Sequence, residues 1–189
     1  MPSYVVVWIL LIFAWAANFV IRVGFSALLP SIIDELGLSY TRAGLLASAF
    51  FYAYVLMQIP AGLLGDRFGR RRILLSGLLG GALAAGLTGL AGSFAALFLA
   101  RALTGALQGS LFSNDRAIIA TVTPADRIGL GQGVSFSGPG IGLTFGFVIG
   151  GLLLELMPWR HVMLLFALGP IAAALLIARY VPAPERTAR

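Results

Sequence analysis

The densest cluster of charge in the 189-residue sequence lies in residues 62–73, which read G-L-L-G-D-R-F-G-R-R-R-I. One carboxylate stands among four arginines, and three glycines allow the backbone to turn sharply. These residues are Gly62, Gly65, Asp66, Arg67, Gly69, Arg70, Arg71 and Arg72. A carboxylate and guanidinium groups this close together can form charge-assisted hydrogen bonds. A short basic segment between two apolar runs normally stays in the cytoplasm.

Polar side chains also recur inside the apolar runs. Asn18, Arg22 and Ser26 are spaced four residues apart, so a helix places all three on one face. The permanent charge and forked donors of Arg22 are suited to binding an anionic group of a substrate in a central cavity. Alternatively, Arg22 extends to the membrane surface or pairs structurally. Both interpretations remain open from the sequence.

Arg101 and Gln108 lie two turns apart on a later apolar run. Arg101 has no acidic residue nearby on its own run, so a carbonyl group, water, a substrate or another helix must meet its charge. Tyr54 and Gln58 are one turn apart on a third run. They either line a cavity or hydrogen-bond a neighbouring helix. Together with Asn18, these residues are the candidate contacts to a solute.

The composition identifies an integral membrane protein, because 59% of the residues are hydrophobic and only 11% are charged. The net charge of +6 comes entirely from arginine. At this hydrophobicity the basic excess indicates membrane orientation and contact with the lipid bilayer, so we expect no nucleic-acid partner. Cysteine is absent and His161 is the single histidine, so we expect no metal site and no cofactor.

About 20 apolar residues are needed to cross a bilayer as a helix, and the chain contains six such runs. The predicted spans are 4–29, 43–64, 73–91, 94–122, 129–154 and 161–181, followed by a cytoplasmic tail, 182–189. The first run is too long for a signal-peptide core and is expected to be retained. The fold predicted is therefore an all-α polytopic membrane protein.

The arginines predict the orientation of the spans. If the basic segment is cytoplasmic, both termini are cytoplasmic, and only Arg42 and Arg160 fall on the outer side. We therefore expect a multi-pass protein of the cell membrane. Asp66-Arg67 and Trp159-Arg160 follow the second and fifth spans on opposite faces, which favours two inverted three-helix units.

Small residues four positions apart predict close contacts between helices, because association in lipid depends on backbone proximity. They occur at Gly77, Gly81, Ala85 and Gly89, at Gly105, Gly109 and Ser113, and at Gly138, Gly142, Gly146 and Gly150. The stretch 137–140, S-G-P-G, is expected to loosen the fifth span. Asp115-Arg116 and Asp126-Arg127 are interpreted as solvated caps near the cytoplasmic side.

The six spans, the segment 62–73 and the R-A-L-T-G run beginning at Arg101 together resemble the amino-terminal half of a major facilitator superfamily transporter. The G-x-x-x-D-R-x-G-R-R pattern of that family is met by the basic segment. A finer resemblance, through residues 18–30, 48–62 and 101–109, is to the anion:cation symporter branch. In that branch Arg22 and Tyr54 would face the substrate. Proton-coupled members carry acids where this chain has Ile21 and Gln108.

The resemblance implies secondary transport of a small, anionic organic solute by alternating access. Residues Gly62, Asp66, Arg67, Gly69, Arg70 and Arg71 would then form a conformational latch, whose charge-assisted bonds exist in one state only. The family has twelve spans, so a second six-helix half, either another copy or a separate chain, would complete the pathway.

Two other functions are compatible with the sequence. A non-transporting membrane scaffold or regulator, or an inactive transporter fragment, would need no second half. Six spans with Ser135 and His161 also resemble an intramembrane serine protease, whose serine and histidine lie on two helices. Interfacial anchoring is the ordinary explanation of His161 beside Trp159-Arg160.

Overall fold

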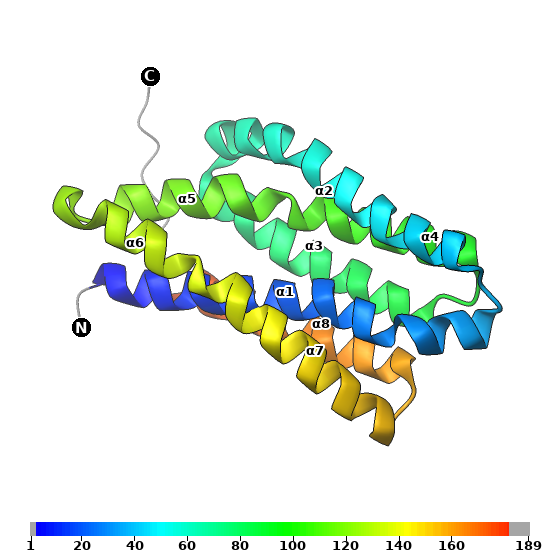
Figure 1. Cartoon of the computed structure of the whole chain (residues 1–189). Helices are drawn as coiled ribbons and strands as arrows, with labels where there is room; N and C mark the ends of the chain where they lie inside the picture. Colours follow the sequence, from blue (N-terminus) through cyan, green and yellow to red (C-terminus); the bar gives the residue numbers. More distant parts are fainter. Residues whose placement is uncertain (1–2, 182–189) are drawn as a thin grey trace.

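Within residues 3–181, which the computed structural model describes, the regular structure is helical throughout. The helices are α1 (Ser3–Leu36), α2 (Tyr40–Phe68), α3 (Arg70–Leu90), α4 (Phe94–Gln108), α5 (Ser110–Val122), the 3₁₀ turn η1 (Ala125–Arg127), α6 (Ile128–Ser135), α7 (Ser137–Leu156) and α8 (Trp159–Tyr180). They form six helical segments long and apolar enough to cross a membrane, in the described part of the chain. The all-α polytopic fold is therefore confirmed (Figure 1).

The first helix is longer than the predicted span 4–29. Pro30 lies inside α1, which continues to Leu36. Proline removes one backbone donor, but Leu28 and Ile32 on either side of it are fully buried. Their packing stabilises the helix across the proline. The bounds of the membrane crossings themselves stay a prediction.

Two of the six segments are interrupted. The fourth is divided at Gly109 into α4 and α5, and the fifth is divided at Phe136 into α6 and α7. The second interruption lies immediately before the S-G-P-G stretch, where loosening was predicted. Nothing in the sequence analysis predicted the first. Each interruption lies between two residues with polar side chains, so it affects the orientation of those side chains.

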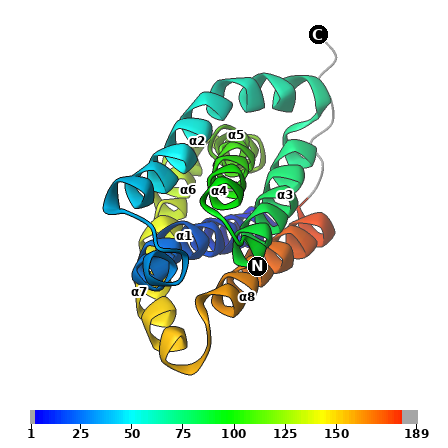
Figure 2. The same cartoon turned by 90° about the vertical axis from the view of Figure 1, so that its right-hand side faces the viewer.

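The helices pack in a pattern that repeats between the two halves of the chain. α1 packs against α7 and α8, α4 packs against α2 and α3, and α3 packs against α8. The end-on view shows α4 between α2 and α3, and α1 between α7 and α8 (Figure 2). Exchanging the first three segments with the last three maps the contacts of α1 onto those of α4, and the α3–α8 contact onto itself. This is the packing expected of two inverted three-helix units.

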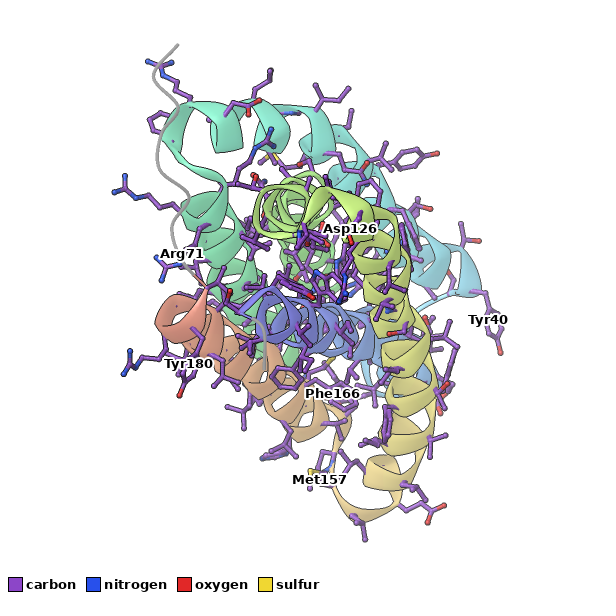
Figure 3. The ribbon with its side chains drawn as sticks, turned by 90° about the vertical axis from the view of Figure 1, so that its left-hand side faces the viewer. Tyr40, Arg71, Asp126, Met157, Phe166 and Tyr180 are labelled. Carbon is purple, nitrogen blue, oxygen red and sulfur yellow. The ribbon has the colours of Figure 1, made fainter. Side chains whose placement is uncertain are left out.

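Two arginines at opposite ends of the bundle follow the same relation. Arg71, in the first turn of α3, donates to the carbonyl of Ala178 near the end of α8, close to the turn that carries Tyr180 (Figure 3). Arg160, in the first turn of α8, donates from Nη1 to the carbonyl of Ala91 at the end of α3 (2.6 Å). Each cation therefore caps the C-terminal end of the other helix.

The glycine faces are confirmed as close helix contacts. A Cβ at Gly105 would collide with the backbone of Phe50 on α2, and one at Gly109 would lie 2.5 Å from the carbonyl oxygen of Tyr54. On α7, a Cβ at Gly138 would lie 2.7 Å from the carbonyl oxygen of Ile12 on α1. Glycine is required at these positions because another backbone occupies the space of a side chain.

The described ends of the chain lie at one end of the bundle. The start of α1, the end of α8, the α2–α3 turn and the α5–α6 connection lie together, and the other three connections lie at the opposite end (Figure 1). The basic segment and both chain ends are therefore on one face, as predicted. That this face is cytoplasmic stays a prediction from the arginine distribution.

The contact between α4 and α2 predicts a strong effect of a single methyl group. Gly105→Ala should lower the midpoint of thermal unfolding of the purified chain in detergent, because overpacking against a backbone costs about 1–3 kcal/mol. Gly44→Ala is the matched control, since a Cβ there meets nothing within 4 Å. A midpoint for Gly105→Ala equal to that of Gly44→Ala would contradict the packing described.

Candidate functional site

Two arginines from different helices share one aromatic ring in the interior. The guanidinium carbon of Arg22 on α1 lies 5.3 Å from the ring centre of Phe50, and that of Arg101 on α4 lies 4.5 Å from it. Phe50 itself is fully buried on α2. Cation–π contacts therefore bring two positive charges to the junction of three helices.

Arg101 is enclosed, with only 2% of its surface exposed. Its guanidinium carbon lies 4.0 Å from the ring centre of Phe25 on α1. Its Nε and Nη1 atoms are buried without a hydrogen-bond partner among the described residues. Burying a charge costs several kcal/mol, and aromatic contacts return about 0.5–2 kcal/mol each. Arg101 therefore retains donors that favour an anion.

Arg22 is half-buried and is surrounded by rings. Its guanidinium carbon lies 4.4 Å from the ring centre of Phe51 and 4.9 Å from that of Tyr54. Tyr54 also contacts Gln58, one turn further along α2. The structure thus brings together four predicted residues, namely Arg22, Tyr54, Gln58 and Arg101.

No acidic residue neutralises these arginines in the described chain. The ion pairs between residues 3 and 181 join Arg70 to Asp66, Arg116 to Asp115, Arg127 to Asp126, and Arg160 to Glu35. Arg22 and Arg101 take part in none of them. We refer to Arg22, Arg101, Phe50 and Tyr54 as the arginine cluster.

The two remaining candidates, Asn18 and Gln108, are both buried. Asn18 lies one turn before Arg22, and its Nδ2 donates to the carbonyl of Ala14 (2.8 Å), while its Oδ1 has no partner within residues 3–181. Gln108 is also buried, but it packs against Gly81 of α3. Asn18 is therefore placed along the stripe of Arg22, whereas Gln108 contacts a different helix.

The basic segment forms a tight turn between α2 and α3. Gly69 has a φ of 103°, which an L-residue with a side chain rarely adopts. Asp66 Oδ1 accepts a hydrogen bond from Arg70 Nη2 (2.5 Å), and Arg70 Nη1 also reaches the carbonyl oxygen of Ser113 on α5 (3.5 Å). A Cβ at Gly65 would collide with Asn114 of the same helix. The turn is therefore held against α5.

The remaining members of the segment point outward or make lighter contacts. The guanidinium of Arg67 lies over the ring of Phe68 (5.3 Å), and Asp66 is largely exposed. A Cβ at Gly62 would make only ordinary contact with Ser113 (3.6 Å). An exposed ion pair can be remade with other partners, so the role of these residues as a latch stays a prediction.

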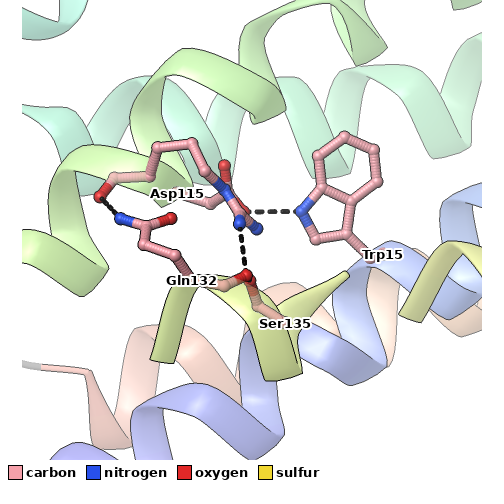
Figure 4. A network of polar contacts seen from close by, with 5 residues as sticks. Trp15, Asp115, Gln132 and Ser135 are labelled. Atoms are coloured by element: carbon pink, nitrogen blue, oxygen red, sulfur yellow. Dashed lines mark hydrogen bonds and ion pairs between the residues drawn. The ribbon is translucent and has the colours of Figure 1, made fainter. Parts of the chain in front are cut away.

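The interpretation of Asp115 as a solvated cap is wrong. Asp115 is 1% exposed, and its Oδ2 accepts hydrogen bonds from Trp15 Nε1 on α1 and from Arg116 Nη2, both at 2.6 Å. Arg116 Nη1 in turn donates to the carbonyl of Gln132 on α6 (3.0 Å). Figure 4 shows this network joining three helices. The sequence did not reveal it, because Trp15 and Asp115 are 100 residues apart in the chain.

Asp126 and Arg127, by contrast, are exposed, with side-chain exposures of 75% and 55%. Their interpretation as a solvated pair is confirmed.

The proposed protease dyad is contradicted. Ser135 is fully buried and donates to the carbonyl of Gln132 (2.8 Å), whereas His161 is exposed in the first turn of α8. Helix α7, with 20 residues, separates them. A helix of that length spans about 30 Å. No serine–histidine pair can therefore form in this arrangement.

The sequence analysis missed the aromatic part of the site. Phe50 and Phe25 hold Arg101, and Phe51 contacts Arg22. The run S-A-F-F-Y-A-Y at 48–54 did contain a signal, because four rings in five positions place aromatic groups on every face of a helix. Which ring faces inward depends on the packing of Gly105 on α2.

Comparison with solved structures shows the fold. The chain matches a bacterial homologue of the human lysosomal transporter Spinster, in an inward-facing and occupied conformation, with a TM-score of 0.93 and 22% identity. The match covers 99% of this chain and 46% of that one.

Curated relatives match over part of their length. The chain is 33% identical over 116 residues to the probable sulfoacetate transporter SauU of Cupriavidus necator, covering 61% of this chain and 27% of that protein. It is 36% identical over 164 residues to the puromycin resistance protein pur8 of Streptomyces alboniger, covering 85% and 32%. The chain thus spans about a third of the length of these relatives.

The family model of the Major Facilitator Superfamily matches residues 7–189, almost the whole chain. Because the match extends over all six helical segments, the resemblance noted in the sequence is confirmed. The chain belongs to the major facilitator superfamily.

Proposed function

We propose that this chain forms one half of a secondary transporter that moves a small organic anion across a cell membrane by alternating access. The observation that carries the proposal is the arginine cluster, in which two guanidinium groups approach one phenyl ring with no carboxylate to neutralise them. Charges left uncompensated in a membrane interior mark substrate or ion pathways.

The chemistry of the cluster favours an anion with more than one oxygen. Each guanidinium presents a planar fork that matches a carboxylate or a sulfonate. The hydroxyl of Tyr54 and the amide of Gln58 add hydrogen-bonding groups at the side of Arg22. A solute carrying a carboxylate and a sulfonate, as sulfoacetate does, would satisfy both arginines. The name of the relative SauU supports this choice of probe.

The proposed transporter needs a second six-helix unit. Apolar side chains on α2 and α7 are exposed along much of both helices, and these helices are equivalent in the two-fold packing. The exposed residues include Val55, Leu56, Ile59 and Leu63 on α2 and Phe145, Phe147, Val148 and Leu152 on α7. We place the second unit, whether a second copy or another chain, against these faces. A scaffold without transport activity would show no solute binding.

Neutralising the cluster should abolish anion binding. Arg22→Gln and Arg101→Gln should each weaken the binding of sulfoacetate to the purified chain at least tenfold, measured by isothermal titration calorimetry in lipid nanodiscs, because each removes a desolvated charge. The matched control is Arg42→Gln, since Arg42 is exposed and its guanidinium carbon lies 5.5 Å from the ring centre of Phe94, which is not part of the arginine cluster. Unchanged affinity in both cluster variants would contradict the proposal.

The basic turn should affect rate and not insertion. Asp66→Asn removes the negative charge that pairs with Arg70, so uptake of sulfoacetate by cells that produce the chain should fall about two- to fivefold. The amount of protein in the membrane, measured by immunoblot, should stay constant. Asp126→Asn, which alters an exposed pair at the same end of the bundle, is the control. A wild-type uptake rate in Asp66→Asn would contradict the hypothesis that this turn is a conformational latch.

A further inference from the structure

Asp115 is the one acidic residue that the described chain buries. The other acids between residues 3 and 181 are exposed. Asp115 lies on α5, and its carboxylate is not required by the arginine cluster, since none of the contacts of Arg22 or Arg101 involves it. A carboxylate in the membrane interior is costly and marks a functional site by default.

The two oxygens of this carboxylate are bonded very unequally. Oδ2 accepts from Trp15 Nε1 (2.6 Å) and from both Nε (3.1 Å) and Nη2 (2.6 Å) of Arg116. Oδ1 is buried and accepts no hydrogen bond from any described residue. A carboxylate oxygen that is buried without a donor destabilises the ionised form. A proton on Oδ1 removes the buried negative charge while leaving every hydrogen bond to Oδ2 in place.

Among the described residues, no second acid contacts Asp115. On its own helix Asp115 faces Arg116, on α1 it faces Trp15, and on α2 it interacts electrostatically with Tyr54. The α6 side offers the uncharged Gln132, whose Nε2 donates to the backbone carbonyl of Arg116 (2.9 Å). On α3, Arg70 reaches α5 at the carbonyl of Ser113, and on α4, Gln108 is uncharged. Asp115 is therefore the local source of negative charge.

We propose that Asp115 is a reversible proton-binding site whose protonation on Oδ1 strengthens anion binding at Arg22 and Arg101. A proton from water forms one new O–H bond at Oδ1, and no covalent bond of the protein breaks. The neutral carboxyl no longer offsets the charge of Arg116, so the net positive charge of the interior rises and attracts an anion more strongly. The inference about the anion rests on the function proposed above, whereas the proton site does not.

The geometry also provides a connection between the two sites. Trp15 donates to Asp115 and lies two helical turns before Arg22 on the same face of α1. The bonds of Arg116 to Gln132 attach α6 to the same carboxylate. A change of charge at Asp115 therefore acts on α1, α5 and α6 together; α5 begins after the interruption at Gly109, and α6 ends before the interruption at Phe136.

Infrared difference spectroscopy of the purified chain in nanodiscs tests the proton site directly. Between about pH 8 and about pH 5, the wild type should gain the C=O band of a protonated, buried carboxyl group, and Asp115→Asn should lack it. Asp126→Asn, which changes an exposed acid, should keep the band. Asp115→Glu should restore it and shows that the loss is not a folding defect. The same band in Asp115→Asn would overturn the proposal.

The link to the anion is tested in the same samples with ethane-1,2-disulfonate, a dianion whose own charge does not change over this range. Wild type should bind it about tenfold more tightly at the lower pH. Asp115→Asn, which resembles the protonated state, should bind tightly at both pH values, and Asp126→Asn should behave as wild type. An unchanged pH dependence in Asp115→Asn would overturn the link. Absence of binding in the wild type would contradict the proposed function, and the infrared band would still decide the proton site.

Discussion

The structure depends on how a membrane interior accommodates two positive charges that have no negative partner. Arg101 is enclosed between Phe25 and Phe50, and Arg22 approaches Phe50 from α1. The ring quadrupoles attract both cations but do not neutralise them, since the cost of desolvating an ion exceeds the gain from a few rings. In the proposed function, an anion that enters between the helices would supply the missing charge.

Close packing between helices sets the positions of Arg22 and Arg101. Gly105 lets α4 touch the backbone of Phe50, one turn after Arg101. A side chain at Gly105 would push α4 away from α2 and separate Arg101 from the ring it shares with Arg22. The glycine face of α7 sets α1 in the equivalent way. In the two-fold packing, α1 and α4 carry Arg22 and Arg101, while α7 packs against α1 and α2 packs against α4.

The helical segments and the positions of Arg22, Tyr54 and Arg101 were predictable because apolar runs and polar residues at helical spacing are local signals. The family was predictable from the pattern at residues 62–73. The buried network was not, because the burial of Asp115 depends on its contact with Trp15, which is 100 residues away in the sequence. The same limit applies to Phe50, since the sequence does not say which of several rings on α2 faces inward.

The central claim is that Arg22 and Arg101 together bind one anion. Crystals of the chain soaked in selenate, a dianion with an anomalous signal, test it most directly. The account predicts an anomalous peak within hydrogen-bonding distance of both guanidinium groups and beside the ring of Phe50. Peaks found solely at surface arginines such as Arg72 and Arg179, with none beside Phe50, would contradict it.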